Sequence, residues 1–270
     1  MWRIADLVRN FFTHKDFLPG ADKLPGTLFT PLHFAVALLF IALVAIACTV
    51  CKKVDESKLK KAFAVLWAFL VFFEITKIVW ESVSGKEVSV ELGGILPLYP
   101  CSIFMYTMPF AIWGKGDVRR AACGYVCTLG LLGGLINFVY PANVLSNYSC
   151  ISFAGFHTLT YHSTMVFCAI TMLLSGYHSY TDAKKFEDLL VPAIPCIVMS
   201  IPANLVNFSP INSDYMFFRL RSFFFAPIGA ALPDVLCVLI VYCLYFLIHA
   251  LPYIPFYIKN KRKMKSEVLH

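Results

Sequence analysis

The chain has 270 residues, of which 59% are hydrophobic and 14% charged, and its formal net charge at pH 7 is +7. Soluble domains carry roughly a quarter charged residues, so this composition indicates an integral membrane protein whose partners are membrane lipids. The positive charge does not indicate a nucleic-acid-binding protein, because the basic residues lie in short segments between apolar runs.

Residues 1–28 are predicted to be an N-terminal interfacial segment. Trp2, Ala5, Val8 and Phe12 recur at helical spacing, so a helix that lies on the membrane surface is expected. An ordinary frayed terminus is the alternative. No signal peptide is expected, because the first long apolar run is as long as a full bilayer crossing and lacks a small-residue cleavage site.

Seven apolar segments follow, each close to the roughly 20 residues that a membrane-spanning helix needs. They are residues 29–50, 62–80, 94–113, 121–140, 156–176, 188–207 and 229–251. Together they predict an all-α fold, a polytopic membrane bundle of about seven transmembrane helices over residues 29–258. Gly130 and Gly134 form a small-xxx-small face that is suited to close helix packing.

The distribution of Lys and Arg predicts the orientation of this bundle. Fifteen of these residues lie on one side of the predicted membrane, seven lie on the other, and Lys77 lies within a span. The more basic side is expected to be cytoplasmic. The N-terminus would then lie outside, and residues 259–270 would form a basic cytoplasmic tail of a multi-pass cell-membrane protein.

Polar side chains within the spans gather on the outer side of this topology. They are Glu74, Lys77, Tyr99, Cys101, Asn137, His157, His162, Asn204, Asn207 and Asp234. Polar groups inside a membrane are costly and therefore mark functional sites. Because the inner half offers no comparable set, the sequence predicts one polar pocket that opens outward. The loop at residues 207–221, which includes Tyr215, would form its wall.

Each of these residues also has a structural interpretation. Glu74 and Lys77 are three residues apart and would then neutralise each other on one helix face. Asn137 and the other asparagines would form hydrogen bonds between helices. Asp234 would be a first-turn residue that the helix dipole favours.

Cys101 differs from the other cysteines, most of which lie in apolar runs and behave as small hydrophobic residues. It directly follows Pro100, and a helix that begins there would place the thiol at the positive helix end, which favours the thiolate. His162 lies at a similar depth and would be its base, as in acyl-transfer enzymes. The alternative is a buried cysteine beside a hydrogen-bonded histidine. No motif predicts a metal, nucleotide or other cofactor.

Four segments occur in an order that resembles the YwaF-like integral membrane proteins: LPLYPCSIF, GLLGGLINFVYP, FHTLTYHSTMV and NSDYMFFR. The resemblance covers about residues 60–250 and implies a seven-helix architecture. That family is distantly similar to an animal transmembrane acyltransferase that moves fatty acyl chains between phospholipids with a Cys and a His. The resemblance implies these roles for Cys101 and His162.

Two positions depart from the pattern of the bacterial family. Tyr99 stands where several bacterial members have His, and Asp214 stands where they tend to have Asn. If that His is required for the chemistry, this chain would bind a substrate without transforming it.

The leading prediction is a lipid acyltransferase or acyl hydrolase, with Cys101 as nucleophile and His162 as general base. The other polar residues of the outer half, together with Tyr215, would bind the lipid substrate. The main alternative is a transporter or small-molecule-binding membrane protein that uses the same pocket, with Glu74 and Lys77 holding a polar solute. A structural or accessory membrane subunit is the third possibility.

Overall fold

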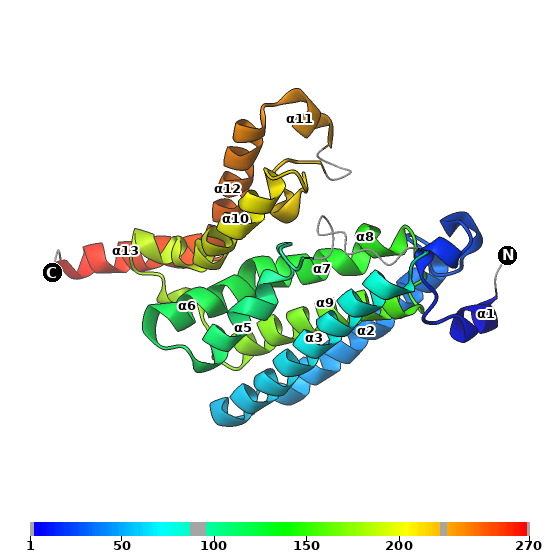
Figure 1. The fold of residues 1–270 in the computed structure, drawn as a ribbon. Helices are drawn as coiled ribbons and strands as arrows, with labels where there is room; N and C mark the ends of the chain where they lie inside the picture. Colours follow the sequence, from blue (N-terminus) through cyan, green and yellow to red (C-terminus); the bar gives the residue numbers. More distant parts are fainter. Residues whose placement is uncertain (1–2, 87–95, 222–225, 269–270) are drawn as a thin grey trace. The chain divides into compact units, whose positions relative to one another are not determined.

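The computed structural model describes residues 3–86, 96–221 and 226–268, and these residues form helices and turns without any strand (Figure 1). Trp2 and the first two residues of the predicted segment 94–113 lie outside the described residues. The chain divides into two compact units, which are described separately below. The first contains Met1–Glu91 and Leu131–Thr171, and the second contains Leu92–Gly130 and Met172–His270.

The first unit consists mainly of α-helices, and the long ones among them lie side by side (Figure 1). They are α1 (Ile4–Arg9), α2 (Pro31–Cys51), α3 (Glu56–Ser84), α7 (Leu131–Val139), α8 (Ala142–Leu145) and most of α9 (Phe153–Leu174). The start of α2 follows from the local sequence. Pro31 occupies the first turn, and the Thr30 hydroxyl accepts a hydrogen bond from the His33 backbone N–H at 3.4 Å.

The residues between α1 and α2 are bound to the rest of the first unit. The Trp80 indole N–H donates to the Phe12 carbonyl at 2.9 Å, and the Lys15 backbone N–H donates to the Tyr148 hydroxyl at 3.2 Å. Only Ile4–Arg9 of the predicted interfacial segment forms an α-helix. Its position on a membrane surface stays a prediction.

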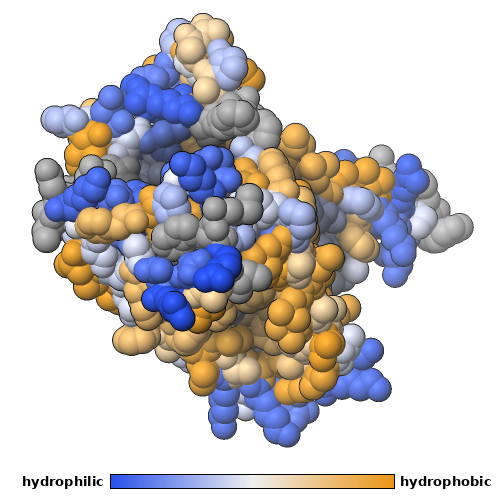
Figure 2. Space-filling model, turned by 90° about the vertical axis from the view of Figure 1, so that its right-hand side faces the viewer, coloured by the Kyte–Doolittle hydropathy of each residue, from blue (hydrophilic) through white to orange (hydrophobic). Residues whose placement is uncertain are grey.

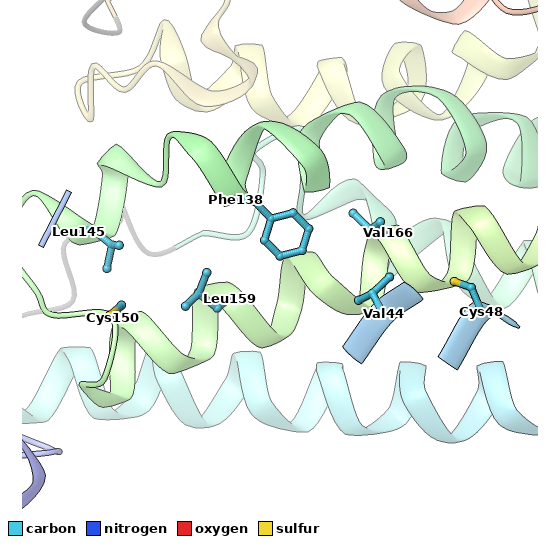
Figure 3. Close-up of a cluster of buried hydrophobic side chains, with 7 residues drawn as sticks. All are labelled: Val44, Cys48, Phe138, Leu145, Cys150, Leu159 and Val166. Carbon is cyan, nitrogen blue, oxygen red and sulfur yellow. The ribbon is translucent and has the colours of Figure 1, made fainter. Parts of the chain in front are cut away.

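A hydrophobic cluster joins α2, α7, α8 and α9 in the first unit (Figure 3). Its buried members are Val44, Cys48, Phe138, Leu145, Cys150, Leu159 and Val166. The helices approach closely at Gly134, where an added Cβ would lie 2.6 Å from Val166 Cγ2 and 3.0 Å from the His162 carbonyl oxygen. Glycine is therefore required by this packing, in agreement with the predicted small-residue face.

The second unit contains shorter helices and one irregular stretch. Its helices are α5 (Ile103–Trp113), α6 (Gly116–Tyr125), the π-helical turn η3 (Val126–Gly130), α10 (Ile194–Asn207), α11 (Ala226–Ala231), α12 (Asp234–Ala250) and α13 (Ile254–Val268). Four 3-10 turns complete it: η4 (Tyr180–Asp182), η5 (Phe186–Leu189), η6 (Val191–Ala193) and η7 (Tyr215–Phe217). Here α6 packs against α5 and α10, and η3 packs against α12. Residues 259–268 of the predicted basic tail are part of α13.

Helices lie in all seven predicted segments, but fewer of them have the length and composition of a membrane span. Four helical stretches in the described residues qualify, and a fifth does if α12 and α13, which are bent by 60°, count as one span. With 22 residues α9 is long enough, but its histidines and hydroxyl residues make it less apolar. The α5 helix has only 11 residues. Seven spans and the orientation of the termini therefore stay predictions.

Many apolar side chains of these helices are exposed. Examples are Leu38, Phe72, Leu205 and Val235, whose exposed fractions are 65%, 69%, 72% and 70%. Figure 2 shows wide patches of hydrophobic residues in orange on the face turned to the viewer. Large exposed apolar areas are unfavourable in water and are expected where helices contact lipid.

The packing at Gly134 leads to a direct prediction. Gly134→Val should lower the thermal unfolding temperature in detergent, because the new side chain cannot fit beside Val166 and the His162 backbone. The expected loss of stability is about 1–3 kcal/mol. Leu135→Ala is the control, since the Leu135 side chain is 44% exposed. Equal stability of both variants and the wild type would contradict this packing.

Candidate functional site

In the first unit, two predicted site residues form a buried contact between a carboxylate and an imidazole. Glu74 Oε2 on α3 lies 3.1 Å from His157 Nε2 on α9, and their side chains are 12% and 7% exposed. The Phe73 ring packs on the imidazole with a centroid distance of 4.6 Å. Among the described residues, the partner of Glu74 is therefore His157, and no ion pair joins Glu74 to Lys77 three residues along α3.

His162, one turn further along α9, is held by the backbone. Its Nδ1 lies 2.7 Å from the Thr158 carbonyl oxygen. Because a carbonyl only accepts hydrogen bonds, Nδ1 carries the proton and Nε2 carries the lone pair. Nε2 is buried and has no hydrogen-bond partner within the described residues. The Thr158 hydroxyl also donates to Asn137 Oδ1 at 3.4 Å, which connects a third predicted residue to this position.

In the second unit, Cys101 lies in a turn just before α5. The helix begins at Ile103, so the expectation that Pro100 occupies its first position is wrong by three residues. The reason is a tight turn in which Ser102 and Ile103 donate their backbone N–H groups to the Tyr99 carbonyl at 2.9 and 3.3 Å. The thiol is half-buried and still precedes the positive end of the helix.

The predicted residues Tyr99 and Asn207 both contact a third, Tyr215, whose side chain is fully buried. Asn207 Nδ2 donates to the Tyr215 carbonyl at 2.9 Å, and Asn207 Oδ1 accepts from the Tyr215 backbone N–H at 2.7 Å. The rings of Tyr99 and Tyr215 are 5.1 Å apart, and the Tyr215 hydroxyl accepts from the Leu96 backbone N–H at 3.0 Å. The end of α10 and the turn before α5 are thus both fixed to this tyrosine.

Charged groups hold the rest of the loop at residues 208–221. Arg219 donates to Asp234 Oδ2 at 2.8 Å and to the Asn207 carbonyl at 3.2 Å. The Asp214 carboxylate accepts the backbone N–H groups of Arg219 and Arg221, at 2.7 and 2.8 Å. Burial nevertheless raises the pKa of Asp214 above its usual range. Asp234 is therefore more than a first-turn residue of α12.

This loop also carries backbone strain. Its non-glycine residues Asn212, Met216, Phe217 and Leu220 have φ angles of 54°, 56°, 57° and 51°. Each such residue costs on the order of 1–3 kcal/mol and persists only where its surroundings fix it. Strained and firmly held loops often belong to functional sites, so the loop remains a good candidate.

The predicted site residues are divided between the two units. Glu74, Lys77, Asn137, His157 and His162 belong to the first, and Tyr99, Cys101, Asn204, Asn207, Tyr215 and Asp234 belong to the second. Asn204 Oδ1 is buried and has no hydrogen-bond partner in the described part of the chain. The single outward pocket and the pairing of Cys101 with His162 would need both units, and both stay predictions.

The sequence did not reveal a polar cluster in the second unit. His249 on α12 contacts two side chains of other elements. Its Nε2 lies 3.4 Å from Sγ of Cys196 on α10, and its Nδ1 lies 2.5 Å from Oγ1 of Thr128 in η3. All three side chains are buried. In the predicted topology His249 would lie near the inner end of the segment 229–251, where the sequence predicts no polar set comparable to the outer one. No local motif signals it, because the contacts join residues 53 and 121 positions apart.

None of the ten cysteines, all of which are described, forms a disulfide. In the parts of the chain that the structure describes, no group of three or more His, Cys, Asp or Glu side chains is arranged to hold a metal ion.

The model of the TMEM164 family matches residues 28–261 of the chain. No curated protein and no solved structure matches it. The matched range includes every predicted site residue and the cluster around His249.

The loop at residues 208–221 gives the next prediction. Arg219→Lys should lower the stability of the loop by about 1–3 kcal/mol, because an ammonium cannot replace the planar guanidinium that binds Asp234, the Asn207 carbonyl and Asn212 Oδ1 at once. Hydrogen exchange of the Tyr215 and Arg219 amides should become faster. Arg221→Lys is the matched control, since Arg221 is exposed, and it should change stability by less than about 0.5 kcal/mol. Equal exchange in both variants would contradict the role of Arg219.

Proposed function

The chain belongs to the TMEM164 family, and we propose that this membrane protein is a lipid acyltransferase that uses a cysteine thiol and a histidine base. The YwaF-like resemblance, a seven-span topology in the cell membrane with the N-terminus outside, and a phospholipid substrate are parts of the same proposal. Support comes from the family, from the apolar helices and from the arrangement of individual side chains.

The observation that carries the proposal is the state of His162. Its Nδ1–H donates to the Thr158 carbonyl at 2.7 Å, which fixes both the ring orientation and the tautomer. The lone pair of Nε2 is buried and unused within the described residues. An imidazole whose Nε2 lone pair is free can accept the proton of a thiol that comes within hydrogen-bond reach.

Cys101 is the proposed nucleophile. A half-buried thiol stays neutral unless a base takes its proton, so the reaction requires the histidine. His162 would accept the S–H proton, and the thiolate would attack the carbonyl carbon of a phospholipid ester. The C–O bond then breaks, and the lysophospholipid oxygen takes the proton from His162. The acyl group remains on Cys101 as a thioester until a second lysophospholipid hydroxyl accepts it.

The other site residues have positioning roles in this proposal. The packed rings of Tyr99 and Tyr215 hold the turn that carries Cys101. Asn207, Arg219 and Asp234 hold the loop that contains Tyr215. No cofactor is needed, because the thiol and the imidazole carry both the nucleophilic attack and the proton transfers.

The proposal predicts the effect of removing the thiol. Cys101→Ala should abolish acyl transfer between phospholipids, with a loss of about 10³-fold or more, because the nucleophile is absent. His162→Gln should cost about 10²–10⁴-fold, because the general base is absent. Both effects are measured by mass spectrometry of lipids after the purified protein is incubated in vesicles with an isotope-labelled phospholipid.

Two variants control for general damage. Cys168→Ala removes a buried cysteine from α9, and Thr158→Val removes a hydroxyl but keeps the carbonyl that orients His162. Both should retain activity within about tenfold, since neither removes a reacting group. Activity that survives Cys101→Ala in a folded protein would end the proposal.

A solute transporter is the second candidate, and the buried Glu74–His157 pair favours it. A carboxylate and an imidazole 3.1 Å apart inside an apolar helix pair are the kind of groups that carry protons or cations across membranes. In this case Glu74→Gln should abolish proton-coupled uptake into vesicles, whereas Cys101→Ala should have little effect. Acyl transfer that is lost with Cys101→Ala and unaffected by Glu74→Gln would exclude this candidate.

A further inference from the structure

The cluster of Cys196, His249 and Thr128 lies entirely within the second unit, and the proposed function does not use it. A cysteine and a histidine in hydrogen-bond contact, with a third group on the other ring nitrogen, form the general arrangement of an activated nucleophile. The contacts come from three different elements: α10, α12 and the π-helical turn η3. Such π-turns are rare and are frequent at functional sites.

The protons of the cluster can be assigned from its contacts. The Thr128 hydroxyl has one proton, and it donates to the Gly124 carbonyl at 2.7 Å. It therefore accepts from His249, so Nδ1 carries the ring proton. In the neutral imidazole Nε2 then has the lone pair, and it faces the Cys196 thiol at 3.4 Å. This assignment gives each of the three contacts one proton and leaves His249 ready to accept the thiol proton.

The second unit also has a small cavity of about 30 Å³. Arg120, His178, Ser179, Pro192 and Tyr253 are among the residues that line it. Such a volume holds about one water molecule.

Gly124 connects the cavity to the cluster. A Cβ at this position would lie 2.8 Å from Pro192 Cγ and 2.9 Å from the Tyr253 hydroxyl, both of which line the cavity. The Gly124 carbonyl accepts the hydrogen bond of Thr128 at 2.7 Å. Only the backbone of one glycine thus separates the cavity from the hydroxyl that orients His249.

Apolar side chains are exposed on the same helix as the cysteine. Ile197 and Val198, the next residues on α10, are 39% and 57% exposed. Exposed apolar side chains beside a thiol and a base suit a substrate with a long acyl chain.

We propose that Cys196, His249 and Thr128 form a second thiol–imidazole site, which accepts a long-chain acyl group as a thioester on Cys196. His249 takes the S–H proton, and the thiolate attacks the carbonyl carbon of an acyl thioester or a phospholipid ester. The bond from that carbon to the leaving sulfur or oxygen breaks, and the leaving group takes the proton back from His249. No oxidant or metal is required.

The test uses the full-length Cys101→Ala protein in vesicles, so that its outcome does not depend on the proposed role of Cys101. One sample receives alkyne-tagged palmitoyl-coenzyme A, and another contains alkyne-tagged phosphatidylcholine. Peptide mass spectrometry then measures hydroxylamine-sensitive label on each cysteine. Label on Cys196 is expected from at least one donor, and the arm that gives it identifies the source. No label on Cys196 from either donor overturns the proposal.

Variants of the two partners test the mechanism. His249→Gln should lower the rate of Cys196 acylation by about 10²-fold, because the general base is lost. Thr128→Val should also lower the rate of Cys196 acylation, whereas Thr128→Ser keeps the hydroxyl and should retain the rate. This comparison of the two Thr128 variants remains decisive if His249→Gln does not fold. Cys168, which is fully buried, is the internal control and should stay unlabelled. Acylation of Cys196 at the same rate in Thr128→Val and Thr128→Ser would overturn the role of the cluster.

Discussion

A polar side chain inside an apolar helix must find its partner within the protein, because lipid tails offer no hydrogen bonds. Each polar contact found within the helices follows from this constraint. Glu74 is paired with His157, the His162 ring is bound to a backbone carbonyl, and His249 has a partner on each ring nitrogen. His162 Nε2 does not meet this constraint, because it is buried without a hydrogen-bond partner in the described residues. Such an unsatisfied buried group is costly, so its presence suggests that the side chain has another use.

The sequence was sufficient for features that depend on local composition. Apolar runs predict helices at all seven positions, and the spacing of Gly130 and Gly134 predicts close packing that is found at Gly134. Composition alone does not identify α9 as a membrane span, because the same histidines and hydroxyl groups that indicate a site also lower its hydropathy. The number of spans and the orientation of the termini depend on the bilayer, and no local pattern in the chain determines either of them.

Contacts between distant residues could not be predicted from the sequence in the same way. Glu74 has a cation three residues away, yet its partner is His157 on another helix, since tertiary packing outweighs a weak pair on one helix face. Cys196 and Thr128 look like ordinary members of apolar runs, and only the fold places His249 between them. Asp214 and Arg219 could be recognised as polar loop residues, but the strain that they hold is a property of backbone angles.

The two Cys–His arrangements differ in the evidence behind them. The pairing of Cys101 with His162 is a prediction from the sequence, and the structure shows that His162 Nε2 is buried without a hydrogen-bond partner in the described residues. For Cys196 and His249 the order is reversed: the contact is present within one unit, and no sequence pattern suggested it. A thiol that already has its base is closer to a reacting geometry, but it is also more deeply buried than Cys101. The proposed reaction at Cys196 therefore depends on access of an acyl donor to the buried thiol. The proposed reaction at Cys101 depends instead on His162, which belongs to the other unit.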